Sequence, residues 1–156
     1  MKPRRIDPEH DDMAALLALI RDAFADMEGR IDPPSSVHTL DPASLQAKAR
    51  VETGFVIEEG RNPIACLFCR PEPPDTLYLG KLAIRPSHQG RGFGWQLLGQ
   101  AEALAGQLGF HTLRLETRIE LTDNHATFTA WGFEKTAEKR HPGFDRTTSI
   151  EMQKLL

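Results

Sequence analysis

The residues with the clearest chemical potential form a glycine-rich stretch near the middle of the chain, Gln89-Gly90-Arg91-Gly92-Phe93-Gly94. This stretch lies between an expected strand and an expected helix. Glycine allows the backbone to approach a ligand closely, and the first amides of a helix have no partner within that helix. The helix dipole and the Arg91 guanidinium add positive charge at the same point. The stretch therefore predicts a loop that binds an anion, with a pyrophosphate as its expected guest.

Two well-known nucleotide-binding loops do not fit these glycines. A Gly-x-Gly-x-x-Gly loop would require glycine at Trp95 or at Leu97, depending on where it starts. A P-loop requires Gly-Lys followed by Ser or Thr, which this chain does not contain. A helix start without a ligand is the plain alternative. In that case Gly92 and Gly94 would each cost about 1 kcal/mol relative to alanine inside a helix, with no gain in return.

The remaining pattern, Gln89-x-x-Gly92-x-Gly94 after Leu82-Ala83-Ile84-Arg85-Pro86, resembles the acyl-CoA signature of the GNAT family of N-acetyltransferases. Later stretches resemble the C-terminal half of that family in order and spacing, namely residues 113–117, 124–128, 131–133 and 146–155. The resemblance covers roughly residues 55–155. The first 54 residues match only as a strand and two helices.

The resemblance implies direct transfer of an acetyl group from acetyl-CoA to an amine, with no covalent enzyme intermediate and no metal. The pantetheine arm is expected between two splayed strands, residues 78–84 and 111–117. There it would pair with the backbone of Leu82 and Ile84, and an amide near Leu82 would polarise the thioester carbonyl. The residues implied for acetyl-CoA binding are Leu82, Ala83, Ile84, Gln89, Gly90, Arg91, Gly92, Phe93, Gly94, Asn124 and Phe128.

Two positions depart from the family pattern. Tyr78 stands where one branch of the family has a glutamate base, and Phe128 stands where many members have a tyrosine that protonates the departing thiolate. A lysine-like amine of pKa about 10.4 is mostly protonated at neutral pH, so a base or a water relay is expected. Tyr78 is the one catalytic candidate that the resemblance supplies. Candidates by residue type alone are Glu58, Glu59, Glu116 and His141.

Asn124 has two interpretations. It lies near the position of a CoA-contacting asparagine in the family, although the family spacing points to Leu121. Alternatively, it caps the short helix that is expected there.

The only cysteines, Cys66 and Cys69, are three positions apart in a stretch that predicts a strand. A redox pair would be expected at the start of a helix, and structural zinc would need a second pair of ligands nearby. Residues three apart on a strand point to opposite faces of the sheet. We therefore expect two inert, structural thiols and no metal.

The elements that position these residues follow from hydrophobic periodicity. A helix is expected to open at Asp7-Pro8-Glu9 and a second one at Asp41-Pro42. The other expected helices cover residues 92–108 and 123–131, and the expected strands cover residues 4–6, 55–57, 64–68, 76–84, 111–117, 133–139 and 147–154. This order predicts an α/β fold with a mixed, mostly antiparallel central sheet of about six to seven strands, about four helices and a parallel splayed pair at the acetyl-CoA site.

Length and composition limit the classes of protein to which the chain can belong. With 156 residues, 40% of them hydrophobic, we expect a single N-acetyltransferase domain over residues 1–156. A net charge of −3 argues against nucleic acid as a partner. No apolar run approaches the ~20 residues of a membrane span, so we expect a cytoplasmic protein with no membrane partner.

The expected function is that of an acyltransferase, an acetyl-CoA-dependent N-acetyltransferase acting on a primary amine of a small molecule or of a peptide or protein. A catalytically silent acyl-CoA-binding module for regulation or interaction is the alternative, for which Phe128 is the best argument. The identity of the amine and the oligomeric state, with a homodimer among the expected forms, are left open.

Overall fold

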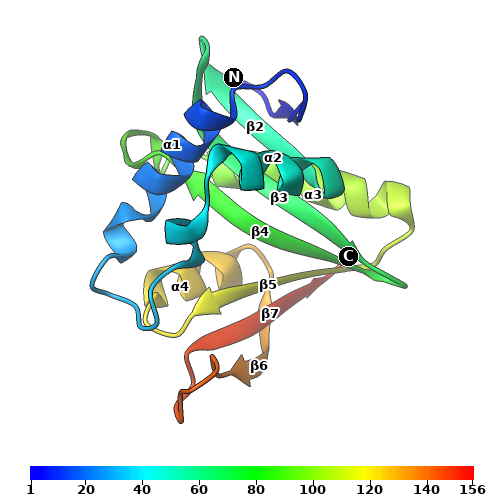
Figure 1. Ribbon diagram of the computed structural model, residues 1–156. Helices are drawn as coiled ribbons and strands as arrows, with labels where there is room; N and C mark the ends of the chain where they lie inside the picture. Colours follow the sequence, from blue (N-terminus) through cyan, green and yellow to red (C-terminus); the bar gives the residue numbers. More distant parts are fainter.

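The computed structural model describes residues 1–156 and is built on one seven-stranded sheet with the order β1-β2-β3-β4-β5-β7-β6. Only the β4 and β5 pair is parallel, and all other neighbours are antiparallel (Figure 1). The strands are β1 (Arg4–Arg5), β2 (Thr53–Glu59), β3 (Asn62–Glu72), β4 (Thr76–Ile84), β5 (Thr112–Arg118), β6 (Glu134–Lys139) and β7 (Ser149–Leu155). This confirms the mixed, mostly antiparallel sheet with one parallel pair.

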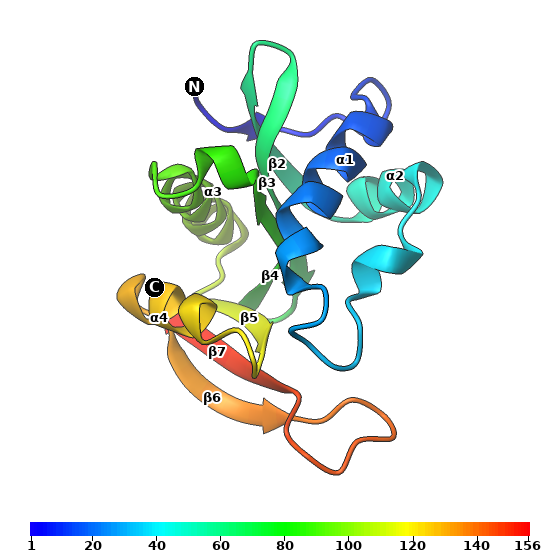
Figure 2. The same ribbon diagram turned by 90° about the vertical axis from the view of Figure 1, so that its left-hand side faces the viewer.

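Four α-helices cover the two faces of the sheet, as expected. Helices α1 (Met13–Phe24) and α2 (Pro42–Val51) lie on one face, and α3 (Phe93–Leu108) and α4 (Thr122–Ala130) lie on the other (Figure 2). Each face has its own apolar core, one beneath α1 and α2 and one beneath α3. Three 3-10 turns complete the fold, at Ala25–Met27, Ser36–Thr39 and Pro86–His88. None of the helices is both long and apolar enough to cross a membrane.

Helix α1 begins later than the sequence indicated. The prediction of a start at Asp7-Pro8-Glu9 was wrong, because the helix begins at Met13 and Asp12 is its N-cap, accepting from the amide of Ala15. Asp7 instead accepts from the Glu9 amide in a preceding turn. Both aspartates satisfy nearby amides in this way, and the capping pattern alone does not distinguish them.

Strand β4 contains a bulge that changes which way its side chains point. Leu67 on β3 lies opposite two residues of β4, and Lys81 there adopts a left-handed backbone conformation with φ 51°. Leu77 and Leu79 pack in the core beneath α3 before the bulge, and Leu82 and Ile84 pack against that core after it. Because the bulge adds one residue, the Lys81 side chain does not continue the row of β4 side chains that face α3.

Candidate functional site

The parallel ladder between β4 and β5 is short and then opens. Pairing covers only Thr76–Tyr78 on β4 and Thr112–Arg114 on β5, after which the strands diverge toward α4 (Figure 1). A cavity of about 420 Å³ occupies the opening. Its walls come from both diverging strands, from α3 and α4, and from the segment between α1 and α2. The sequence predicted this splayed pair.

The edge of β4 that faces the opening offers free backbone groups. The amide of Arg85 donates to Ile64 on β3 at 2.8 Å. Backbone groups alternate in direction along a strand, so those of Leu82 and Ile84 point the other way, where β5 has diverged. The Ile84 carbonyl accepts from the Gln89 side chain at 3.3 Å. Leu82 and Ile84 therefore lie where the sequence placed them, while Ala83 between them is buried against the α1 side.

The glycine-rich stretch forms the predicted loop and the first turn of α3. Gly90 and Gly92 have positive φ angles of 75° and 84°, and no atom lies within 4 Å of a Cβ built on either one. The amides of residues 90–95 donate to no other atom of the protein. A short run of free amides around open space at a helix start is the arrangement that binds phosphate groups. The exposed Arg91 lies beside it, above the Phe93 ring.

Gly94 is required for a different reason than the other glycines. A Cβ at this position would lie 2.8 Å from the Trp131 ring and 3.1 Å from Ile84. Gly94 thus allows α3 to pack closely against the residue that follows α4, and it also borders the cavity.

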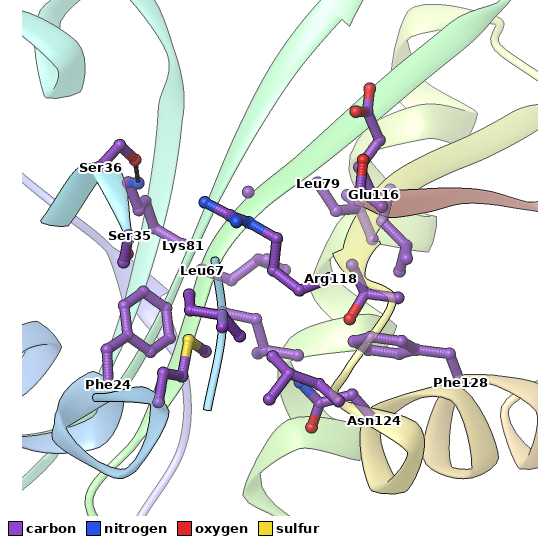
Figure 3. A pocket seen from close by; sticks show the side chains of 18 of the residues that line it. Phe24, Ser35, Ser36, Leu67, Leu79, Lys81, Glu116, Arg118, Asn124 and Phe128 are labelled. Carbon is purple, nitrogen blue, oxygen red and sulfur yellow. Dashed lines mark hydrogen bonds between the residues drawn. The ribbon is translucent and has the colours of Figure 1, made fainter. Parts of the chain in front are cut away.

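Asn124 and Phe128 line the cavity from α4, as Figure 3 shows. The alternative in which Asn124 caps the helix is wrong, because the N-cap is Leu121 and no side chain caps this end. Phe128 makes edge-on contacts with Trp131 at 5.6 Å and with Phe133 at 6.1 Å between ring centres. Phe128 is therefore partly a packing residue and partly a wall of the cavity.

Tyr78 lies at the point where the strands separate. Its ring is held between the guanidinium groups of Arg70 and Arg114, at 4.6 and 4.5 Å from the ring centre. Burial, followed by the charge of Glu116, raises the pKa of the Tyr78 phenol. The phenol is therefore protonated at neutral pH and is suited to donate a hydrogen bond, not to accept a proton.

The four candidates proposed by residue type differ in whether they line the cavity. Glu58 pairs with Arg4, and Glu59 lies at the exposed end of β2, so neither lines the cavity. Glu116 lines the cavity, but it accepts from Arg114 at 2.7 Å and from Lys139 at 3.2 Å, and its carboxylate points away from the centre (Figure 3). Arg114 and Lys139 also pair with Glu151, so Glu116 belongs to a network of charges directed away from the cavity.

His141 is the best placed of the basic groups. It lines the cavity from the loop between β6 and β7, and burial, together with the charge of Arg118, lowers its pKa. Its Nδ1 contacts the Thr148 hydroxyl, which itself donates to the Lys139 carbonyl. The lowered pKa favours the neutral imidazole, and in that form an Nδ1 that donates to Thr148 leaves Nε2 as an acceptor.

Further polar residues line the cavity that the sequence did not indicate, among them Lys81, Thr117 and Arg118. Lys81 and Arg118 reach in from the two diverging strands, and the buried Thr117 hydroxyl has no hydrogen-bond partner. Charged residues within strands suggest an exposed face, so Lys81 and Arg118 did not stand out. One signal was present, since the apolar spacing Leu77, Leu79, Leu82, Ile84 contains a three-residue step that indicates a bulge.

The two cysteines lie on opposite faces of the sheet, as predicted. Cys66 belongs to the core beneath α1, and Cys69 to the core beneath α3. Burial raises the pKa of both thiols to about 12, so neither is a thiolate at neutral pH. No group of three or more His, Cys, Asp or Glu side chains is arranged to hold a metal ion.

One known protein family matches this chain by sequence. A sequence model described as the Acetyltransferase (GNAT) family matches residues 15–133. No curated protein matches the chain.

Solved structures resemble the whole chain. A Klebsiella pneumoniae protein assigned as an acyl-CoA N-acyltransferase is 25% identical, with a TM-score of 0.71 over 99% of this chain and 97% of that one. The PaiA N-acetyltransferase from Thermoplasma acidophilum, in complex with coenzyme A, is 14% identical, with a TM-score of 0.81 over 99% and 98%. An aminoglycoside 6'-acetyltransferase of type Ii is also 14% identical, with a TM-score of 0.79 over 99% and 97%.

Proposed function

The chain belongs to the acetyltransferase (GNAT) family, and on that premise we propose that residues 1–156 act as one N-acetyltransferase domain that moves an acetyl group from acetyl-CoA to a primary amine. The observation that carries the proposal is the run of free amides at residues 90–95, which borders the opening between β4 and β5. Donors for a pyrophosphate and a channel for a pantetheine arm are thus adjacent.

The residues present fit acetyl-CoA. The amides of residues 90–95 and the Arg91 guanidinium would hold the pyrophosphate, where Gly90 and Gly92 leave the space free. The backbone groups of Leu82 and Ile84, which have no partner on β5, would bind the amide groups of the pantetheine arm. Asn124 and Phe128 would line the side of the channel formed by α4.

Acetyl-CoA supplies the acetyl group, so that a C–N bond to the amine forms, the C–S bond breaks, and an amide and a thiol result. In this chain the Nε2 of His141, directly or through one water, would take the proton that the amine loses. A backbone amide of β4 near Leu82 would stabilise the charge that develops on the carbonyl oxygen.

The departing thiolate requires little help. Phe128 cannot donate a proton, and a thiol with a pKa near the ~8.5 of cysteine leaves readily as an anion. The neutral Tyr78 phenol also lines the cavity, and its raised pKa suits it to donate a hydrogen bond to the departing sulfur and not to give up its proton.

The test combines binding with turnover. The two tryptophans of the chain, Trp95 and Trp131, lie close together beside the free amides, with ring centres 6.3 Å apart. Titration with CoA should therefore change the intrinsic fluorescence of the protein. A panel of amines with acetyl-CoA, followed by thiol release and by mass spectrometry of the products, should reveal an acetylated amine.

The two readouts distinguish an active enzyme from the second candidate function, a catalytically silent acyl-CoA-binding module. Phe128 is the observation that favours this second candidate. Saturable CoA binding with no acetylated amine in the panel would support the silent module. Absence of CoA binding would overturn both.

A further inference from the structure

The wall of the cavity formed by β4, β5 and the segment between α1 and α2, which we take as the acceptor side, carries two positive charges that form no salt bridge with a carboxylate. Lys81 on β4 donates from Nζ to the Ser36 hydroxyl at 2.9 Å. Arg118 on β5 donates to the backbone carbonyls of Pro33 at 2.7 Å and Pro34 at 3.2 Å. Figure 3 shows Arg118 reaching across the opening toward the β4 side of the cavity, where the Lys81 side chain turns to Ser36. Both are hydrogen-bonded to neutral groups only.

The acidic residues nearby are already occupied. Glu116 is bonded to Arg114 and Lys139. Glu120 accepts from the Asp32 amide through one oxygen and lies 3.7 Å from Arg146, while its other oxygen is buried without a partner. Glu52, the carboxylate that acts on Lys81, pairs with Lys48 at 2.7 Å. Burial lowers the pKa of Lys81 and of Arg118; the charges of Lys48 and then of Arg118 act on Lys81 in the same direction, and that of Glu52 opposes them. The free protein therefore holds two cations in a partly buried site without a salt bridge to either.

From this juxtaposition we propose that the amine acceptor is a small molecule that also carries an anionic oxyacid group, a carboxylate or a phosphate, which binds between Arg118 and Lys81. The proposal rests on the proposed function and names its substrate class. Two of the Arg118 donors are fixed by Pro33 and Pro34, so the guanidinium is oriented before the ligand arrives. Its remaining donors match the paired oxygens of such an anion.

The same charges select among acceptors. The positive field of two cations disfavours the binding of an ammonium group that carries no compensating anion. An anion on the acceptor offsets the repulsion that this field would otherwise cause during binding. A polyamine gains no such compensation. We therefore expect selection against acceptors that carry several amines.

The experiment compares acceptors that share one amine. β-Alanine is measured against β-alanine amide, phosphoethanolamine against ethanolamine, and 1,3-diaminopropane represents the polyamines. The kcat/KM of an anionic acceptor should exceed that of its neutral partner at least about tenfold, the effect of one hydrogen bond between charged groups. The carboxylate and phosphate arms identify which oxyacid is preferred.

Variants distinguish recognition of the anion from a structural role. Arg118→Gln and Lys81→Gln should reduce the ratio of anionic to neutral acceptor, whereas a structural defect lowers both rates and leaves the ratio unchanged. Arg146→Gln is the matched control. Arg146 donates to the Asp32 carbonyl in the same segment at 3.0 Å but does not line the cavity, so its loss should preserve the ratio. Melting temperature and CoA affinity are measured for every variant.

Failure of the inference and failure of the proposed function give different results. Equal kcat/KM for anionic and neutral acceptors leaves the acetyltransferase in place and overturns the inference. If no amine reacts, calorimetry compares N-acetyl-β-alanine with its amide on the protein, with and without CoA. Tighter binding of the carboxylate, lost in Arg118→Gln, supports the inference without turnover. Equal binding, or none, overturns it.

Discussion

The Arg118 guanidinium on β5 donates to the carbonyl oxygen of Pro33 at 2.7 Å, so one side chain both lines the cavity and holds the segment that covers it. Arg146, in the loop before β7, supports the same segment through the carbonyl of Asp32. The segment between α1 and α2 is thus fixed by residues far along the chain. The site consequently depends on the N-terminal region, which carries no recognisable motif.

Replacing Gly92 should weaken CoA binding. In Gly92→Val the side chain would occupy the open space beside the free amides, and valine resists a φ of 84°. We expect at least about a tenfold rise in Kd by calorimetry, equivalent to one hydrogen bond to a charged group. Gly99→Ala is the control, because Gly99 is an exposed residue of α3 with nothing near its added Cβ. If Gly92→Val bound CoA with undiminished affinity, the loop would not be part of the CoA-binding site.

The pH profile should report His141. Its pKa is lowered, so the imidazole stays neutral to a lower pH than an ordinary histidine. We expect kcat/KM to fall on the acid side with an apparent pKa below 6.5. His141→Gln should lower the rate and abolish this limb, whereas the exposed His111→Gln should retain it. In Arg118→Gln the limb should move to higher pH, because a neighbouring positive charge is lost. An unchanged limb in His141→Gln would exclude His141 as the base.

Phe128→Tyr tests whether a tyrosine at this position can act as the general acid that this chain lacks. If the new hydroxyl faces the cavity, turnover should stay equal or rise, and the melting temperature should change little. If it faces Trp131 and Phe133 instead, it is buried without a partner at a cost of about 1–3 kcal/mol. Turnover and melting temperature are measured together. A markedly lower melting temperature with no kinetic effect would identify Phe128 as a packing residue alone.

Both cysteines should be unreactive in the folded protein. With thiol pKa values of about 12 and full burial, a thiol reagent should modify neither until denaturant is added. Cys69→Ser should lower the melting temperature more than Cys66→Ser. Cys66 already contacts the Lys81 carbonyl, whereas Cys69 has no polar partner for a new hydroxyl. Rapid labelling of the folded protein would contradict this assignment.

Much of the fold was predictable because its signals are local. The β4 strand and helices α2 and α3 follow from alternation, caps and a closing glycine. The start of α1 was not predictable from local signals, since Asp7 and Asp12 both satisfy the preferences of a helix N-cap and only packing selects between them. Predicting the glycine loop required no tertiary information, because its chemistry lies in consecutive backbone amides.

The sequence by itself determined the parallel pairing of β4 and β5, the glycine-rich loop at the start of α3 and the opposite faces of Cys66 and Cys69, each of which depends on neighbours within one element or one β-α-β unit. Only the tertiary structure showed that Lys81 and Arg118 line the same cavity as His141. Pro33, Lys81, Arg118 and His141 belong to four separate segments, and they meet because β4 and β5 diverge and a bulge redirects Lys81. Charge and spacing within a strand do not reveal such convergence, since it depends on how distant segments pack together.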